Sequence, residues 1–220
     1  MRKIIALIPV LILSLAMFSQ KDPEAKRILD KTSTKFKTFN TFKANITYVL
    51  EVPTNKSLNT TSKFDVLFKK DNKYYMKNSD GEETYCNGKY VWQYFDDECT
   101  KLDFDADDVP IDIQKMLDTY EEEYKYIVSG SETIDNIKYT VIDLNPDKSG
   151  KELVGSDVFK IKMLINPNTY EVKQWIIFEK NGNRHKFKIN TFSANVTIPD
   201  SKFVFDKSKY PGVEVEDLSE

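Results

Sequence analysis

The residues that could carry out acid–base or metal chemistry are few and scattered along the 220 residues. The single histidine, His185, lies between two basic residues and cannot form a typical zinc site by itself. The three glutamates of residues 121–123 end a helical segment, with no neighbour that would prepare a carboxyl group for proton transfer. No nucleophile elbow, phosphate-binding loop or dinucleotide-binding loop occurs. We therefore expect neither an enzyme nor a cofactor.

The acidic segment of residues 103–108 resembles the start of a calcium loop. Asp108 occupies the sixth position of that loop, where glycine is needed for the turn, and Gln114 occupies the twelfth, where glutamate binds the ion. We therefore interpret the segment as a solvated loop and expect no metal site.

The composition is that of a folded, acidic protein. The chain holds 14 Phe, 12 Tyr and 2 Trp, and 40% of its residues are apolar, which excludes a disordered chain. Its 32 basic and 35 acidic side chains give a net charge of −3, so no basic surface would hold nucleic acid.

The N-terminus has the pattern of a secretory signal. Two basic residues precede an uncharged stretch at 4–17, which is short for a membrane span and is followed by small residues. We predict that residues 1–20 are a cleaved signal peptide, with an uncleaved anchor as the alternative. Residues 21–220 then form a single exported domain, and we expect a monomer.

Two cysteines in an oxidising compartment could form a disulfide. Residues 82–104 read as a three-stranded meander that places Cys86 and Cys99 beside opposite turns, about 13 Å apart at ~3.3 Å per residue. We predict that both thiols are free.

Two segments have the spacing of amphipathic helices. In the first, at residues 22–37, Pro23 suits the first turn and Ile28, Leu29 and Phe36 share one face. In the second, at residues 111–124, the apolar face is formed by four residues. These are Ile113, Met116, Leu117 and Tyr120.

Most of the remaining chain alternates between apolar and polar residues. Segments of this kind, separated by short Asn-, Asp- and Gly-rich turns, predict about 10–11 antiparallel strands in one strongly curved sheet. The helices then either complete an ordinary core or cover the sheet as a lid over an apolar cavity. Periodicity leaves both open.

Three segments, which follow one another in the same order as in the family, resemble the bacterial periplasmic lipoprotein carrier family, LolA. Residues 64–76 are similar to its strand–KRPxxFRW–strand segment, residues 87–94 to its DGKxxWxY hairpin, and residues 201–215 to its closing F-x-F … P-x-G-V segment. In this sequence Lys70 stands closest to the family's lid-holding arginine, and Asp71 stands where the family has proline. Lysine keeps the charge but lacks the planar fork of arginine.

The resemblance implies an incomplete β-barrel whose helical lid closes an apolar cavity for acyl chains, with Lys70 as a candidate lid latch. It also implies triacylated lipoproteins as cargo, an inner-membrane ABC-type releasing complex as donor and an outer-membrane acceptor. The cavity would be lined by residues of both helices and of the strands. From the strands these are Ile46, Tyr48, Leu50, Phe64, Val66, Phe68 and Trp92.

Three other functions are conceivable with such a fold. A carrier of another lipid, such as a glycolipid or an isoprenoid, cannot be separated from the first by sequence. A sensor of lipid would need an additional domain or anchor beyond Phe205, where few residues remain. A lipid hydrolase would need a nucleophile and a base that we do not find.

Overall fold

One twelve-stranded sheet makes up most of the computed structural model, which describes residues 21–105, 113–147, 155 and 157–220. The predicted signal peptide lies outside this part of the chain, as do residues 106–108 of the acidic segment. The elements follow in the order α1 (Pro23–Lys37), β1 (Thr41–Glu51), β2 (Thr60–Lys69), β3 (Lys73–Asn78), β4 (Glu83–Asn87), β5 (Tyr90–Phe95), β6 (Glu98–Asp103), α2 (Ile113–Glu123), β7 (Tyr124–Ile134), β8 (Ile137–Pro146), β9 (Val158–Ile165), β10 (Val172–Glu179), β11 (Arg184–Ala194) and β12 (Glu214–Asp217).

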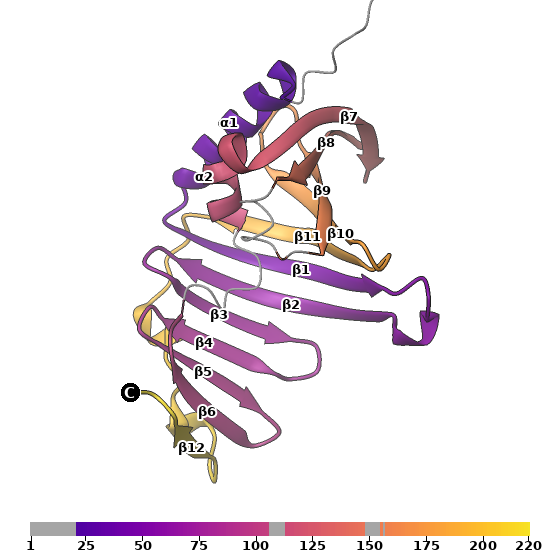
Figure 1. Ribbon diagram of the computed structural model, residues 1–220. Coiled ribbons are helices and arrows are strands. Elements are labelled where there is room, and N and C mark those ends of the chain that lie inside the picture. The colour runs from indigo at the N-terminus through magenta and orange to yellow at the C-terminus, as the bar shows by residue number, and fades with distance from the viewer. Residues whose placement is uncertain (1–20, 106–112, 148–154, 156) are drawn as a thin grey trace, which may run out of the picture.

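The sheet is open and strongly bent, as an incomplete barrel is (Figure 1). Its strand order is β12-β6-β5-β4-β3-β2-β1-β11-β10-β9-β8-β7, so β1 and β11 join two meanders at the centre. The predicted fold class is confirmed. The strand count is one higher than expected because the four-residue β12 adds to the edge, where it pairs in parallel with β6.

Tight turns with left-handed backbone connect the hairpins. Asp71-Asn72, Asp96-Asp97 and Asp135-Asn136 have two successive residues with positive φ, the conformation that matches the twist of two-residue hairpins. Aspartate and asparagine tolerate this region better than other side chains do. The turn chemistry thus accounts for the short connections.

Helix α1 begins as its sequence predicts. The Asp22 carboxylate accepts a hydrogen bond from the Glu24 amide at 2.9 Å, and Pro23 occupies the first turn. The other Asp22 oxygen accepts from the Val128 amide of β7 at 2.9 Å, so the cap also fixes the helix to the sheet.

The two faces of the sheet are covered at opposite ends. We call the face that carries α1 and α2 the helix face; the helices cover it over β7–β10. The segment from Phe203 to Val215 covers the other face over β4–β6, which we call the C-terminal face. The described helices leave the middle of the helix face, on β1, β2 and β11, partly open.

Candidate functional site

The helix-covered end of the sheet is a continuous apolar core. The buried side chains Ile28, Leu29, Met116, Leu117 and Tyr120 pack with residues of β7–β10, and Phe36 packs against the same cluster while partly exposed. These are the helical residues that the sequence analysis placed over an apolar surface. The structure brings them together in one cluster.

Polar contacts join α2 to α1. The Tyr120 hydroxyl donates to the Asp30 carboxylate at 2.7 Å, and the Ser33 hydroxyl donates to Asp118 at 3.2 Å. The ion pair between Lys26 and Glu121, at 2.9 Å, lies at the same interface. The two helices are therefore one packed unit.

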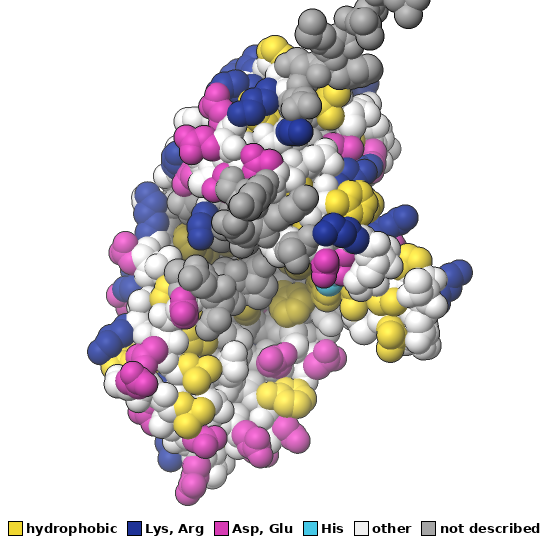
Figure 2. Space-filling model, in the orientation of Figure 1, with side chains coloured by type: hydrophobic (Ala, Val, Ile, Leu, Met, Phe, Trp, Pro, Cys, Tyr) yellow, Lys and Arg dark blue, Asp and Glu magenta, His cyan; other side chains and the backbone are white. Residues whose placement is uncertain are grey.

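The open middle of the helix face is apolar and aromatic. Cross-strand pairing places the predicted residues of β1 and β2 on it together. All six are partly exposed, and they are Ile46, Tyr48, Leu50, Phe64, Val66 and Phe68. Figure 2 views the molecule from this side and shows hydrophobic side chains in a hollow beneath the helices.

An aromatic ladder crosses this surface. Trp175 of β10 stacks on Phe187 of β11 with ring centroids 4.9 Å apart, and Phe187 lies 5.0 Å from Tyr48 of β1. Tyr48 in turn meets Phe64 of β2 edge-on at 6.5 Å. Rings in such contact add to the apolar energy of a surface and hold it rigid. The ladder connects the helix-covered core with the open part of the sheet.

One residue, Trp92, differs from its predicted place. Trp92 lies on the C-terminal face, where it is 9% exposed and packs among Tyr85, Phe205 and Val213. Successive residues of a strand point to opposite faces, and its neighbour Val91, which pairs with Cys86, lies on the helix face. Trp92 therefore does not line the helix face. Ile113 begins α2, and its side chain lies outside the described part of the structure.

Lys70 contacts α1 rather than α2. Its ammonium group donates to the Lys37 carbonyl at 3.4 Å, at the last turn of α1, where a cation is favourable for the helix dipole. Its amide donates to the Asn40 carbonyl at 2.9 Å, so Lys70 joins the end of β2 to the chain that leaves α1.

A hydrogen-bonded relay ends at the ladder, and sequence analysis missed it. The Tyr48 hydroxyl lies 2.9 Å from Nδ1 of His185, and Nε2 of His185 lies 3.0 Å from the Glu179 carboxylate. Burial acts to raise the pKa of Glu179, but hydrogen bonds from Asn181, His185 and Asn183 outweigh it and hold that pKa below its ordinary value. Only the β1–β11 pairing reveals this contact, because Tyr48 and His185 lie far apart in the chain.

The indole nitrogen of Trp175 is the second polar atom at the ladder. It is buried and has no hydrogen-bond partner among the described residues. An indole N–H that is withdrawn from water normally finds an acceptor. The ladder thus carries one donor that no described residue satisfies.

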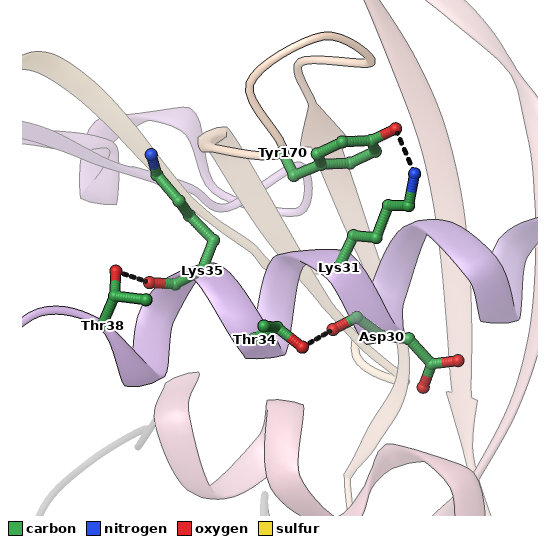
Figure 3. Close-up of a pocket in the computed structure, with 6 residues that line it drawn as sticks. All are labelled: Asp30, Lys31, Thr34, Lys35, Thr38 and Tyr170. Carbon is green, nitrogen blue, oxygen red and sulfur yellow. Dashed lines mark hydrogen bonds between the residues drawn. The ribbon is translucent and has the colours of Figure 1, made fainter.

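Two surface pockets lie along α1. One, of about 340 Å³, is shallow and lined by Asp30, Lys31, Thr34, Lys35, Thr38 and Tyr170 (Figure 3). The Lys31 ammonium donates to the Tyr170 hydroxyl at 3.0 Å, and this cation lowers the pKa of that phenol. The other, of about 230 Å³, lies between Phe36, Phe39 and the bulge of β11 around Asn190.

Within residues 21–105 and the later described ranges, no three His, Cys, Asp or Glu side chains gather as a metal site would require. None of the described helices has the length and apolar character needed to cross a bilayer. Cys86 and Cys99 are both free, as predicted, and lie on opposite faces of the sheet.

Comparison with known proteins identifies the fold. No protein-family model matches the sequence, and no curated protein matches it either. Among solved structures, the lipoprotein LppX from Mycobacterium tuberculosis matches 81% of this chain and 100% of its own, with 14% identity and a TM-score of 0.56. LprF from Mycobacterium bovis matches 81% of this chain and 97% of its own, also with 14% identity, at a TM-score of 0.54.

A LolA superfamily protein from Nitrosomonas europaea matches too, over 82% of this chain and 97% of its own, with 12% identity and a TM-score of 0.43. The two mycobacterial structures, whose TM-scores exceed 0.5, identify the fold. The chain shares the fold of LppX and LprF: one open, bent sheet with helices over one face.

Proposed function

We propose that the protein is a carrier that shields acyl chains on its helix face. The observation that carries this proposal is the partly exposed aromatic ladder, which continues the buried core beneath the helices into the open part of the sheet. Large contiguous apolar surfaces on soluble proteins mark binding sites.

The energetics favour such a carrier. A sixteen-carbon acyl chain withdrawn from water gains roughly 12 kcal/mol, at about 0.8 kcal/mol for each buried CH₂. A lipoprotein with several such chains cannot cross an aqueous gap unshielded. An apolar sheet face partly covered by helices can accept the chains without a chemical step.

The protein would be a non-enzymatic, exported monomer. After loss of residues 1–20 it would take triacylated lipoproteins from an inner-membrane ABC-type releasing complex and deliver them to an outer-membrane acceptor. A second candidate is a periplasmic binder of another lipid. The ladder favours it equally, since its surface contacts the acyl part rather than the protein part of a lipoprotein.

Binding of a synthetic triacylated lipopeptide tests the proposal. We would compare the wild type with Ile46→Glu, on the helix face of β1, and with Val49→Glu, which lies on the other face of the same strand and is also partly exposed. A charge against the acyl chain should weaken binding at least tenfold in Ile46→Glu and leave Val49→Glu close to the wild type. Equal affinities of all three proteins, or no binding by the wild type, would refute the helix face as the site.

Native mass spectrometry of protein purified from its own cell envelope separates the two cargoes. Co-purified triacylated lipoproteins support the ferrying role, and free lipid alone supports the second candidate.

A further inference from the structure

A row of phenylalanine rings leads from the open middle of the helix face to the pocket beside the bulge of β11. Phe68 of β2 stacks on Phe42 of β1 with ring centroids 4.8 Å apart, and Phe42 lies 5.4 Å from Phe192 of β11. Phe192 lies 5.2 Å from Phe39, which follows α1, and Phe39 lies 5.5 Å from Phe36. The last three rings of this phenylalanine row line the pocket, so the apolar surface continues into it.

The pocket, which we call the bulge pocket, exists because the sheet is interrupted there. β10 pairs with β11 only as far as Gln174 opposite Lys188, both strands being described throughout, while β11 continues beyond that pair. The extra residue of the β11 bulge, Asn190, donates from its side-chain amide to the side chains of Asn45 and Thr47 of β1, at 2.8 Å each. The bulge is therefore fixed by side-chain contacts, and the gap beside it is a pocket of about 230 Å³.

Most side chains around the bulge pocket are apolar, and the charged ones are held in pairs. Lys35 lies 3.8 Å from the Glu171 carboxylate across the opening. The ammonium group of Lys173 donates to the Ile189 carbonyl at 2.8 Å and lies 3.9 Å from the Asp135 carboxylate. The described residues thus present no unbalanced charge here, and a charged head group that left water at this point would lack a counter-ion.

The volume of the bulge pocket suits part of a ligand rather than a whole one. Sites that enclose a complete small molecule measure about 300–1,000 Å³. An apolar pocket of about 230 Å³ at the end of an aromatic row instead fits the end of an acyl chain whose remainder lies outside it. Ile189 lines this pocket and pairs across the sheet with Ile46, a residue of the open middle of the helix face. The pocket therefore begins where the surface proposed for acyl chains ends.

We propose that the bulge pocket takes the methyl end of one acyl chain, while the rest of that chain lies along the phenylalanine row and the open middle of the helix face. This rests on the proposed function, because it concerns how the same face recognises its cargo. A triacylated lipoprotein can place one of its chains in this way, and so can another lipid with a long chain. Affinity then depends on chain length, since a chain gains from the pocket only when it is long enough to reach it.

A series of lipopeptides that carry one acyl chain of eight, twelve or sixteen carbons on the same uncharged peptide tests the proposal. Each methylene moved from water to an apolar site raises affinity roughly fourfold. Ile137 lines the pocket, is 44% exposed and lies outside the phenylalanine row, so Ile137→Trp should fill the pocket and leave the core intact. Loss of room for two or more methylenes should weaken binding of the sixteen-carbon probe at least tenfold and leave the eight-carbon probe unchanged.

Ile127→Trp is the matched control. Ile127 is 37% exposed on β7 and lines neither of the two surface pockets described above. The same substitution there should leave the affinities of the whole series as in the wild type. Thermal unfolding of both variants close to that of the wild type shows that any loss of binding comes from the pocket and not from the fold.

A photoreactive probe locates the chain end in the wild type without any substitution. With a diazirine on the carbon next to the methyl end of the sixteen-carbon chain, crosslinks should fall on residues that line the pocket, such as Phe39, Ile137 and Ile189. With the diazirine next to the peptide, they should fall on the open middle of the helix face.

Two results would overturn this inference and leave the proposed function intact. One is a folded Ile137→Trp variant that binds the sixteen-carbon probe as tightly as the wild type does. The other is a chain end that crosslinks outside the bulge pocket. Failure of the wild type to bind any lipopeptide of the series would overturn both the inference and the proposed function.

Discussion

The Tyr120 hydroxyl on α2 lies 2.7 Å from the Asp30 carboxylate on α1, and this contact joins the two helices above their shared apolar core. Both side chains of the pair are placed by helical spacing within their own segments, yet they are 90 residues apart in the chain. A helix pair fixed in this way covers the sheet as one body. Whether α2 can move away from the sheet can be tested by substitution.

Replacement of Leu117 by Asp tests whether α2 can leave the sheet. Leu117 is 2% exposed within the main core, so a carboxylate there would be buried without a partner. If α2 stays in place, the free energy of unfolding should fall by about 3 kcal/mol or more. If α2 swings away as a lid, the melting temperature should hold while capture of a triacylated lipopeptide falls. Glu122→Gln, at an exposed site of the same helix, is the control and should change neither quantity.

Glu83→Gln should destabilise the C-terminal face. The Glu83 side chain is buried and accepts hydrogen bonds from Lys77 at 2.8 Å, Tyr210 at 2.9 Å and Tyr75 at 3.1 Å. Because charge-assisted bonds are lost, we expect a loss of about 1–3 kcal/mol in urea unfolding. The exposed neighbour Glu82→Gln should change stability little. Equal stability of both variants would show that the cluster adds nothing.

The same carboxylate predicts an acid dependence. Burial acts to raise the pKa of Glu83, but the hydrogen bonds from Lys77 and the tyrosines hold it below its ordinary value. A lowered folded-state pKa means that its contribution is complete above the unfolded pKa of about 4.3 and is lost as the pH falls through the folded value. The stability difference between wild type and Glu83→Gln should therefore shrink steadily below about pH 4. A constant difference down to pH 2 would contradict this account.

Gly88→Ala should be costlier than Gly182→Ala. Both glycines have positive φ, at 88° and 94°, so both substitutions strain the backbone by about 1–2 kcal/mol. A Cβ at position 88 would also lie 2.4 Å from the Asp71 carbonyl oxygen, whereas at 182 nothing lies within 4 Å. Thermal unfolding should place Gly88→Ala clearly below Gly182→Ala. The reverse order would mean that the β2–β3 turn yields freely.

The cysteines should be present as two unreactive thiols. Burial raises the pKa of both Cys86 and Cys99, so little thiolate is available to a thiol reagent in the folded protein. Titration of the denatured, unreduced protein should return two thiols per chain, and titration of the folded protein close to none. A count of zero after denaturation would demonstrate a disulfide.

The sequence was sufficient for the elements that local chemistry determines. Alternation and turn residues predicted up to eleven of the twelve strands, and the register beside Asn87-Gly88 correctly separated the two cysteines. It was not sufficient for β12, because four residues are too few to show a period of two. Alternation within one hairpin shows which residues share a face of the sheet, but it does not show which face the helices cover. Trp92 was assigned to the wrong face for that reason.

The relay depends on tertiary structure alone. His185 read as an isolated polar residue on a strand, since neither Tyr48 nor Glu179 stands at a spacing that marks a site. Its partners are set by the pairing of β1 with β11 and by the turn after Glu179. Such contacts follow from strand order, which periodicity does not contain.

The central β1–β11 pair also governs the order in which the protein can fold. Phe42 pairs with Ala194, so the two ends of this joint are separated by most of the chain, while each flanking meander is built from neighbouring hairpins. Contacts of such long range form slowly, after local ones. Until β11 is available, β1 is paired with β2 on one edge only, and the two meanders are not yet joined. The ladder of Trp175, Phe187 and Tyr48 is complete only once that last joint has closed.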